Sequence, residues 1–363
     1  MKIAFFGSSL VSSYWNGAAT YYRGLLKALA ALGESVTFYE PDAFERQSHR
    51  DIPDPDWARV VVYQASEDGW RLALEEAARN ADVIVKASGV GVFDVELEIA
   101  VPEAARSSQM TIYWDVDAPA TLESIAASSD HHLRRMIPRY DLVLTYGGGE
   151  PVIGRYREFG ARECVPIYNA LDPQTHHPAL PRTDYACDLG FLGNRLPDRE
   201  ARVEEFLLEP ARLLPDRKFL LGGAGWETKQ MPANVKAIGH VGSNAHNAFF
   251  CSGLATLNIN RDSMARFGFS PPTRVFEAAG AGAAIISDTW EGMAQFLEPG
   301  QEVLLAENGA AVAALLDELR PDRARRIGEA ARRRVLAEHT YAHRARQVTT
   351  LLASRNNRKE AAA

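Results

Sequence analysis

The feature that most constrains this chain is an alternation of short apolar runs, glycine-containing loops and amphipathic helices. Residues 2–6 form an apolar run, Gly7 ends it, and apolar side chains at helical spacing follow over 19–32. Residues 36–39 form the next apolar run. Strand, glycine loop, helix and strand make a βαβ unit, whose strands are parallel. The pattern predicts an α/β fold and places ligand-binding residues in the loops after the strands.

The same alternation continues along most of the chain. Residues 172–185 interrupt it, because they are rich in proline and histidine and lack periodicity, as is typical of a linker. We therefore expect an N-terminal domain over 1–175, a C-terminal domain over 176–340, and a C-terminal helix with a mobile tail over 341–363. Further strands are predicted at 81–86, 110–114, 142–145, 164–168, 187–192, 218–221, 235–238, 254–259 and 283–287.

Composition excludes several classes of protein. The chain has 40 basic and 47 acidic residues, and a net charge of −7 disfavours general nucleic-acid binding. No apolar run reaches 18 residues, so no transmembrane segment is expected. The three cysteines are far apart and odd in number, which predicts neither a disulfide framework nor a zinc cluster and favours a reducing, cytoplasmic location.

The segment 273–300 carries the strongest functional signal. The loop before it, which includes Ser270, leads through two prolines into a helix with Arg274 and Glu277 on one face. Backbone N–H groups at a helix N-terminus and arginine side chains suit a diphosphate. A carboxylate such as Glu277 can accept hydrogen bonds from both hydroxyls of a ribose. These residue types therefore indicate a nucleotide-diphosphate site.

The same segment, TRVFEAAGAGAAIISDTWEGMAQFLEPG, resembles the donor site of glycosyltransferases with the GT-B fold, and most closely the CgeB-like (spore maturation) group. Many retaining GT-B enzymes carry a second glutamate eight positions before the first. Here that position is Phe269, a departure that favours the CgeB-like group. Other supporting stretches are Tyr113–Pro119 (YWDVDAP), Asp188–Arg195 (DLGFLGNR) with Arg199, and Gly239–Val241 (GHV).

The resemblance implies two Rossmann-like parallel-sheet domains facing across a cleft, with the acceptor on the first and the donor on the second. It implies transfer of a sugar from a nucleotide-diphosphate sugar, preferably UDP-linked, to an acceptor hydroxyl without a metal. Besides that co-substrate no cofactor is expected. The residues expected to bind the donor are Glu277, Arg274, Arg195, Arg199, Gly7, Ser8, Asn16, Gly17, Gly223, His240, Val241 and Ser270.

Two aspartates at the end of the predicted strand 110–114 are candidate catalytic groups. Asp115 and Asp117 are alternate residues, so both carboxylates could meet one cation, as in the other glycosyltransferase fold. Either could instead cap the helix that follows. We expect Asp117 or Asp115 to activate or orient the acceptor as a carboxylate base. The nine histidines show no zinc-ligand spacing, so no metal is predicted.

Other functions stay open from the sequence alone. A nucleotide-sugar 2-epimerase and a non-catalytic, two-lobed nucleotide- or sugar-binding protein have the same architecture. The acceptor is not identified, and a glycan, a protein, a lipid or a small molecule each fit. Residues 320–346 carry nine arginines and three acids, a local charge of +6. This segment indicates a solvated helix face and leaves peripheral contact with an anionic membrane as an alternative.

Overall fold

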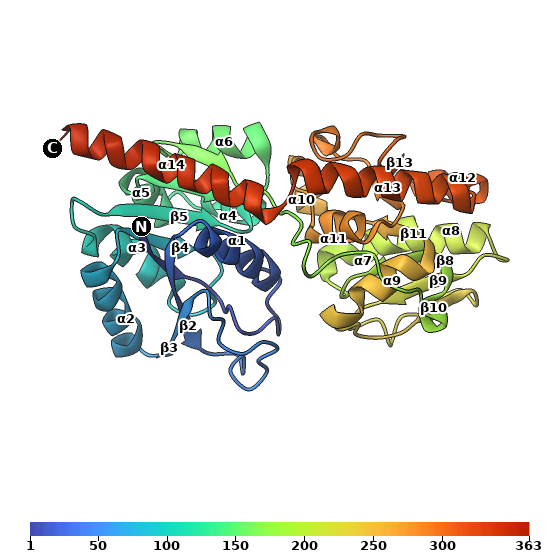
Figure 1. Cartoon of the computed structure of the whole chain (residues 1–363), viewed down its shortest axis with the longest axis horizontal. Helices are drawn as coiled ribbons and strands as arrows, with labels where there is room; N and C mark the ends of the chain where they lie inside the picture. The colour runs from blue at the N-terminus through green and yellow to red at the C-terminus, as the bar shows by residue number, and fades with distance from the viewer. Residues whose placement is uncertain (363) are drawn as a thin grey trace. The chain divides into compact units, whose positions relative to one another are not determined.

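A computed structural model describes the backbone of residues 1–362 and the side chains of residues 1–355. The chain divides into two compact units. The first contains residues 1–168 together with the chain from Tyr341 onward, and the second contains residues 169–340. Both units are α/β, and each is built around one parallel sheet (Figure 1). The predicted parallel α/β architecture is therefore present in both halves.

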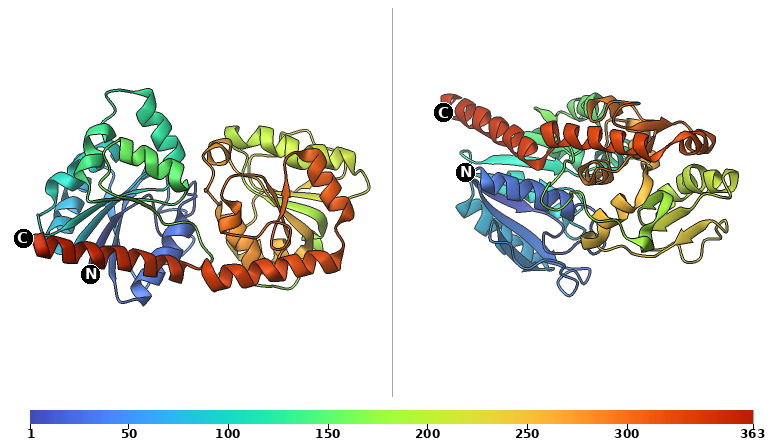
Figure 2. Two further views of the ribbon diagram at one scale, coloured as in Figure 1. Left: turned by 90° about the horizontal axis from the view of Figure 1, so that it is seen from above. Right: turned by 45° about the vertical axis from the view of Figure 1, so that its right-hand side comes forward.

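The sheet of the first unit has seven strands in the order β3-β2-β1-β4-β5-β6-β7, and every pairing is parallel. Helices cover both faces of this sheet (Figure 2). The strands are β1 (Lys2–Phe6), β2 (Ser35–Asp42), β3 (Arg59–Gln64), β4 (Val83–Ala87), β5 (Met110–Asp115), β6 (Leu142–Thr145) and β7 (Cys164–Pro166). The helices are α1 (Ala19–Ala31), α2 (Glu67–Asn80), α3 (Asp94–Ala104), α4 (Ala118–Ala127), α5 (Leu133–Met136), η1 (Ile137–Arg139), α6 (Gly149–Glu158) and α14 (Tyr341–Ala362).

The sheet of the second unit has six parallel strands in the order β10-β9-β8-β11-β12-β13, which repeats the order of the first six strands of the other sheet. Its strands are β8 (Cys187–Leu192), β9 (Phe219–Gly222), β10 (Val235–Ala237), β11 (Gly253–Asn258), β12 (Ile285–Asp288) and β13 (Leu304–Ala306). Its helices are η2 (Thr183–Tyr185), α7 (Pro197–Val203), η3 (Glu204–Leu208), α8 (Glu209–Leu213), η4 (Ser243–Ala245), α9 (His246–Ser252), α10 (Asp262–Phe267), α11 (Thr273–Ala281), η5 (Met293–Gln295), α12 (Gly309–Glu318) and α13 (Pro321–Glu338).

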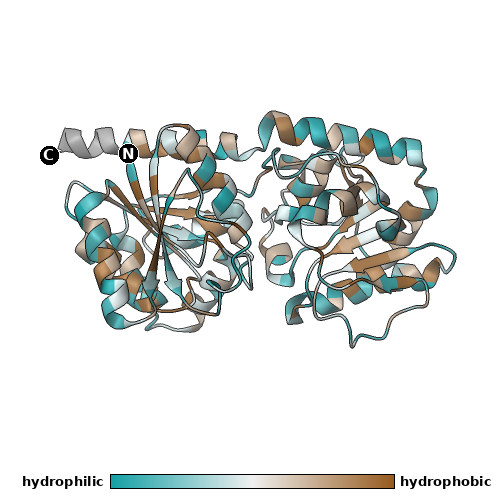
Figure 3. Ribbon diagram, turned by 60° about the horizontal axis from the view of Figure 1, so that its bottom comes forward, coloured by the Kyte–Doolittle hydropathy of each residue, from teal (hydrophilic) through white to brown (hydrophobic). Residues whose placement is uncertain are grey.

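Continuous apolar runs form the central strands because both faces of each sheet are buried. Every residue of β4, β5 and β6 is buried, and the strands stand out as hydrophobic in Figure 3. Two strands escape the sequence analysis. β3 lies at the sheet edge and buries only one residue, while β13 has only three residues. Weak burial and short length leave such strands without an apolar signal.

The chain enters the second unit earlier than the composition of residues 172–185 suggests. Asn169 donates its side-chain amide to the Pro271 carbonyl, and the Leu171 N–H bonds to the His339 carbonyl. His176 is buried. Residues 172–185 thus belong to the second unit, although most of them are exposed and His176 is buried.

The C-terminal helix α14 completes the first unit by packing on α1 (Figure 1). Gly24 of α1 is required there, since a Cβ atom at this position would lie 2.2 Å from the ring of Tyr341. Helix α14 continues to Ala362, through the segment expected to be a tail, and Ala363 lies outside the described residues. Within residues 1–362, no helix combines the length and the apolar character needed to cross a membrane.

In doubly wound sheets of this order, ligands bind at the point where the strand order reverses, beyond the carboxyl ends of the strands. In the first unit this point lies between β1 and β4, and in the second it lies between β8 and β11. The loops after these four strands are therefore the expected positions of ligand-binding residues in each unit.

Candidate functional site

Three glycine-containing loops meet at the carboxyl ends of β8, β9 and β10. The Gly193 N–H bonds to the Gly222 carbonyl at 2.8 Å, and the Gly223 N–H bonds to the Gly239 carbonyl at 2.6 Å. Gly223 has φ +134°, and a Cβ atom there would lie 2.2 Å from the Gly193 oxygen. Buried Trp226 donates its indole N–H to the same oxygen. Trp226 is therefore a core residue that fixes the Gly193 loop.

Two arginines converge on Gly193. A Cβ atom at this position would lie 3.0 Å from Nη2 of Arg274 and 3.2 Å from Nη1 of Arg199. Arg199 comes from α7, which begins at Pro197 as predicted, and Arg274 comes from the first turn of α11. The absence of a side chain at Gly193 leaves this space open beside both guanidinium groups.

Arg274 is buried without a carboxylate partner. Its Nε donates to the Leu192 carbonyl and its Nη1 to Oδ1 of Asn258, and its guanidinium lies 4.7 Å from the ring centre of Phe191. Among the described residues no acid forms an ion pair with it. Burial, followed by the like charge of Arg199, lowers the pKa of Arg274 to about 9. The site thus holds positive charge that a bound anion would stabilise.

The loop before α11 adds further anion-binding features. Phe269 has φ +46°, a conformation that side chains rarely adopt, and its N–H bonds to the Glu291 carbonyl. The hydroxyl of Ser270 is buried and has no partner among the described residues. Backbone strain and unpaired polar groups concentrate at functional sites. This loop ends at the N-terminus of α11, the positive end of the helix dipole.

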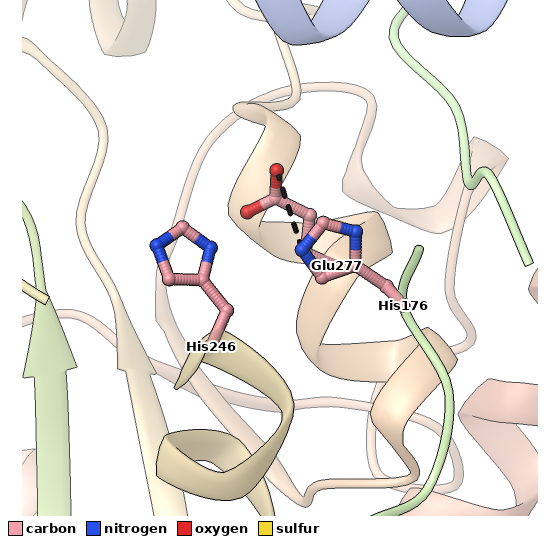
Figure 4. A group of neighbouring side chains, drawn as sticks. All are labelled: His176, His246 and Glu277. Atoms are coloured by element: carbon pink, nitrogen blue, oxygen red, sulfur yellow. Dashed lines mark ion pairs between the residues drawn. The ribbon is translucent and has the colours of Figure 1, made fainter. Parts of the chain in front are cut away.

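Glu277 lies one turn after Arg274 on α11 and is 9 % exposed. Its carboxylate accepts no hydrogen bond from a described residue. The imidazoles of His176 and His246 point toward it (Figure 4), and Nε2 of His176 lies 4.0 Å from Oε1 of Glu277. A half-buried histidine, His246, comes from α9, and burial lowers its pKa against the attraction of Glu277. The Glu277 carboxylate is therefore a largely buried hydrogen-bond acceptor that receives no hydrogen bond from the described residues.

Arg195 is engaged elsewhere. Its guanidinium donates to both carboxylate oxygens of Glu200 and to Oγ1 of Thr228. In the predicted turn near the base, His240 is exposed, Val241 is buried, and the Val241 carbonyl lies 3.3 Å from Nε2 of His246. The structure thus brings Arg274, Arg199, Ser270 and Gly223 around one loop cluster, with Val241 beside His246.

In the first unit the loop after β1 is bonded within itself. Ser8 donates its hydroxyl to Oδ1 of Asn16, and the amide of Asn16 donates to the carbonyls of Ser9 and Ser12. Gly7 is required by packing, because a Cβ atom there would lie 2.5 Å from the ring of Phe38. No atom lies within 4 Å of a Cβ at Gly17.

The two candidate catalytic aspartates differ sharply. Asp115 is fully buried and accepts hydrogen bonds from Ser88, Thr121, Tyr156 and the Asp117 N–H. Burial raises its pKa despite these donors. Asp117 precedes α4, its side chain makes no capping bond, and it is only partly buried. Asp115 therefore organises the turn, and Asp117 is the more accessible carboxylate.

Sequence reasoning missed several residues of the second-unit cluster. Asn258, buried at the end of β11, holds Arg274 and also bonds to Ser287. His246 faces Glu277 from a helix far away in sequence. A polar residue at the carboxyl end of an otherwise apolar strand is the one signal that could have identified Asn258.

Comparison with known proteins gives the following matches. Residues 199–350 match the glycosyl transferase-like family. No curated protein sequence matches the chain. Sucrose-phosphate synthase from Thermosynechococcus elongatus has 14% identity and a TM-score of 0.72, over 98% of both chains. HepE from Anabaena, solved with UDP-glucose, has 15% identity and a TM-score of 0.67, over 98% of this chain and 100% of that chain. An alpha-glucosyltransferase bound to UDP and DNA has 10% identity and a TM-score of 0.70, over 97% and 99%.

Identities this low establish the fold alone. They confirm the expected architecture, two Rossmann-like parallel-sheet domains of the GT-B type. The glycosyl transferase-like match covers the part of the chain that contains Arg199, Arg274 and Glu277. These matches do not confirm the CgeB-like group.

Proposed function

We propose that this chain, a glycosyltransferase of the GT-B fold, transfers a sugar from UDP-sugar to an acceptor hydroxyl. The observation that carries the donor assignment is the arginine pair at Gly193, with one turn of α11 separating Arg274 from Glu277. An anion at the pair and a diol at Glu277 match the diphosphate and the ribose of a nucleoside diphosphate. Similar structures solved with UDP and with UDP-glucose support UDP as the nucleotide.

The diphosphate is assigned to Arg274, Arg199, the hydroxyl of Ser270 and the N-terminus of α11. Charge-assisted bonds from guanidinium groups and backbone N–H groups stabilise the departing diphosphate. This positive charge supports transfer without a metal at the phosphates. Arg195 is bonded to Glu200, and Ser8 and Asn16 are bonded to each other, so we leave them out of the donor contacts.

The ribose is assigned to the Glu277 carboxylate, and the base to the turn at His240 and Val241. In the first unit, Asp117 is the residue we assign to activating the acceptor hydroxyl, and Asp115 positions its turn. The acceptor itself, whether glycan, protein, lipid or small molecule, is not assigned. We also keep the CgeB-like group, which Phe269 in place of a second glutamate favours, and a cytoplasmic location, which the three free cysteines favour.

Titration calorimetry of the full chain with UDP, in the presence of EDTA, tests the donor site. Wild type should bind UDP more tightly than its 2′-deoxy analogue. Glu277→Gln should lose that preference and bind UDP at least about tenfold more weakly, because a hydrogen bond to a charged group contributes about 1.5–3 kcal/mol.

Glu318→Gln, an exposed glutamate on α12 of the same unit, is the matched control and should bind like wild type. Unchanged UDP affinity in Glu277→Gln would remove the ribose assignment. Absence of UDP binding by wild type would remove the donor assignment altogether. No observation favours the 2-epimerase or the non-catalytic binder over transfer.

A further inference from the structure

We infer that His176, His246 and Glu277 form a binding site for a zinc-type divalent cation in the second unit. Each residue offers one ligand atom, and these atoms lie within 4.8 Å of one another. Figure 4 shows the two imidazoles and the carboxylate pointing toward a common centre from three separate segments. The site goes beyond the proposed function, and only its competition with nucleotide, described below, rests on that function.

The first line of evidence is two unsatisfied imidazole nitrogens. Nε2 of His176 and Nδ1 of His246 are buried and have no hydrogen-bond partner among the described residues. The side chain of His176 is more than nine-tenths buried. A buried polar atom without a hydrogen-bond partner lowers the stability of the fold by about 1–3 kcal/mol. A ligand that bonds to both nitrogens and to the carboxylate would therefore stabilise this cluster.

The second line of evidence is the proton assignment on His246. Its Nε2 lies 3.3 Å from the Val241 carbonyl, which can only accept a hydrogen bond. Nε2 therefore carries a proton, and in the neutral ring Nδ1 presents a lone pair.

The same reasoning applies to His176. The hydroxyl of Thr175 lies 3.1 Å from the Asp172 carbonyl and 3.0 Å from Nδ1 of His176. When the hydroxyl donates to the carbonyl, it accepts from Nδ1, which then carries the proton and leaves Nε2 with a lone pair. Metal-binding histidines characteristically donate their second ring nitrogen to an oxygen in this way.

With the protons placed on these two nitrogens, Nε2 of His176, Nδ1 of His246 and the Glu277 carboxylate face one another as three lone-pair donors. Two neutral imidazoles and a carboxylate are a donor set that zinc prefers, with bonds of about 2.0–2.2 Å and a fourth position left open. Binding would draw the three ligand atoms together by roughly an ångström, which rotation of the Glu277 side chain allows. Magnesium, which prefers oxygen ligands, should not occupy the site.

Zinc and nucleotide should exclude each other, because both require the Glu277 carboxylate. In this arrangement the cation is an inhibitor of donor binding. The competition is the one part that depends on the ribose assignment.

The test uses the full chain, stripped of metal and titrated with Zn²⁺ by calorimetry and with Co²⁺ by visible absorption. We expect one ion per chain, a Co²⁺ absorption spectrum typical of four- or five-coordination, and no displacement by millimolar Mg²⁺. His176→Gln and His246→Gln should each lower Zn²⁺ affinity at least 10–100-fold, the range found when even an outer partner of a ligand is removed. His177→Gln, the exposed neighbour, should bind Zn²⁺ like wild type.

The inference is overturned if wild type binds no stoichiometric Zn²⁺ or Co²⁺, or if both glutamine variants keep wild-type affinity. It is also overturned if His177→Gln loses affinity equally. Saturating UDP should weaken Zn²⁺ binding at least tenfold, and independent binding of the two would remove the competition. UDP binding in EDTA is measured separately, so failure of the donor site and failure of the metal site give different results.

Discussion

The two units share the order of six strands but differ in how several polar side chains at their switch points are paired. In the first unit, buried Lys86 bonds to Asp94, Ser9 bonds to Glu40, and Asp115 accepts from four donors. In the second unit, Arg274 forms no ion pair with an acid among the described residues, and Glu277 has only His176, at 4.0 Å, as an ion-pair partner there. The two candidate regions therefore differ in how fully their charged side chains are hydrogen-bonded.

The first unit exposes two aromatic rings beside charged groups. Trp15 is 74% exposed and Phe44 is 52% exposed, and both line a hollow of about 460 Å³ with Glu45, Arg46 and Gly91. Trp15 and Phe44 also have positive φ. This hollow therefore combines apolar rings with charged groups of both signs.

The largest expected effect tests whether the first unit contributes chemistry at all. Asp117→Asn should lower the rate of sugar transfer, measured as UDP formed from UDP-sugar, about 10²–10⁴-fold. This is the usual contribution of a general base, and UDP affinity should stay unchanged. The rate is measured on the UDP-sugar that wild type consumes fastest. A rate within threefold of wild type would leave the first unit without a catalytic carboxylate.

Asp115→Asn is the companion variant. It should lower the free energy of unfolding by about 1–3 kcal/mol, because an amide cannot accept all the bonds that the buried carboxylate accepts. Asp117→Asn should leave stability unchanged, which separates the two roles.

The next effect compares the buried arginines of the two switch points. Arg274→Met should weaken UDP binding at least thirtyfold, since loss of a buried charged partner costs about 2–5 kcal/mol. Arg46→Met removes a buried guanidinium that donates to the Ser8 and Val90 carbonyls of the first unit, and it should change UDP affinity less than twofold. Calorimetry measures the UDP affinity of both variants after circular dichroism confirms that they fold. Equal losses of UDP affinity in both variants would contradict the proposed difference between the two switch points.

The last comparison concerns stability alone, in the glycine loops. Gly223→Ala should lower the free energy of unfolding by about 2–5 kcal/mol, because it combines positive φ with a clash against Gly193. Gly239→Ala has positive φ without a clash and should cost about 1–2 kcal/mol. Gly17→Ala of the first unit has neither and should stay within about 0.5 kcal/mol. Urea unfolding gives all three values, and a neutral Gly223→Ala would contradict the tight loop junction.

Local signals explain how much of the structure the sequence predicts. Continuous apolar runs predict the central strands, and Gly33, with φ +92°, ends α1 as expected. The position of Arg274 and Glu277 on one helix face was predictable because they lie three residues apart. The approach of His176 and His246 to Glu277 was not, because residues from three distant segments show no recognisable spacing. Asp115 and Asp117 look equivalent in sequence, and only burial distinguishes them.

The division of the chain also sets an order of events during synthesis. The second unit is one continuous segment, but the first is completed by α14, whose Tyr341 packs at Gly24. On a ribosome the first 168 residues emerge early yet lack their covering helix until α14 (Tyr341–Ala362) is made. The second unit can close before the first is finished. The nascent N-terminal segment therefore exposes the surface of α1 until α14 is synthesised. Chaperones would be needed most during that interval, because transiently exposed apolar surface favours aggregation.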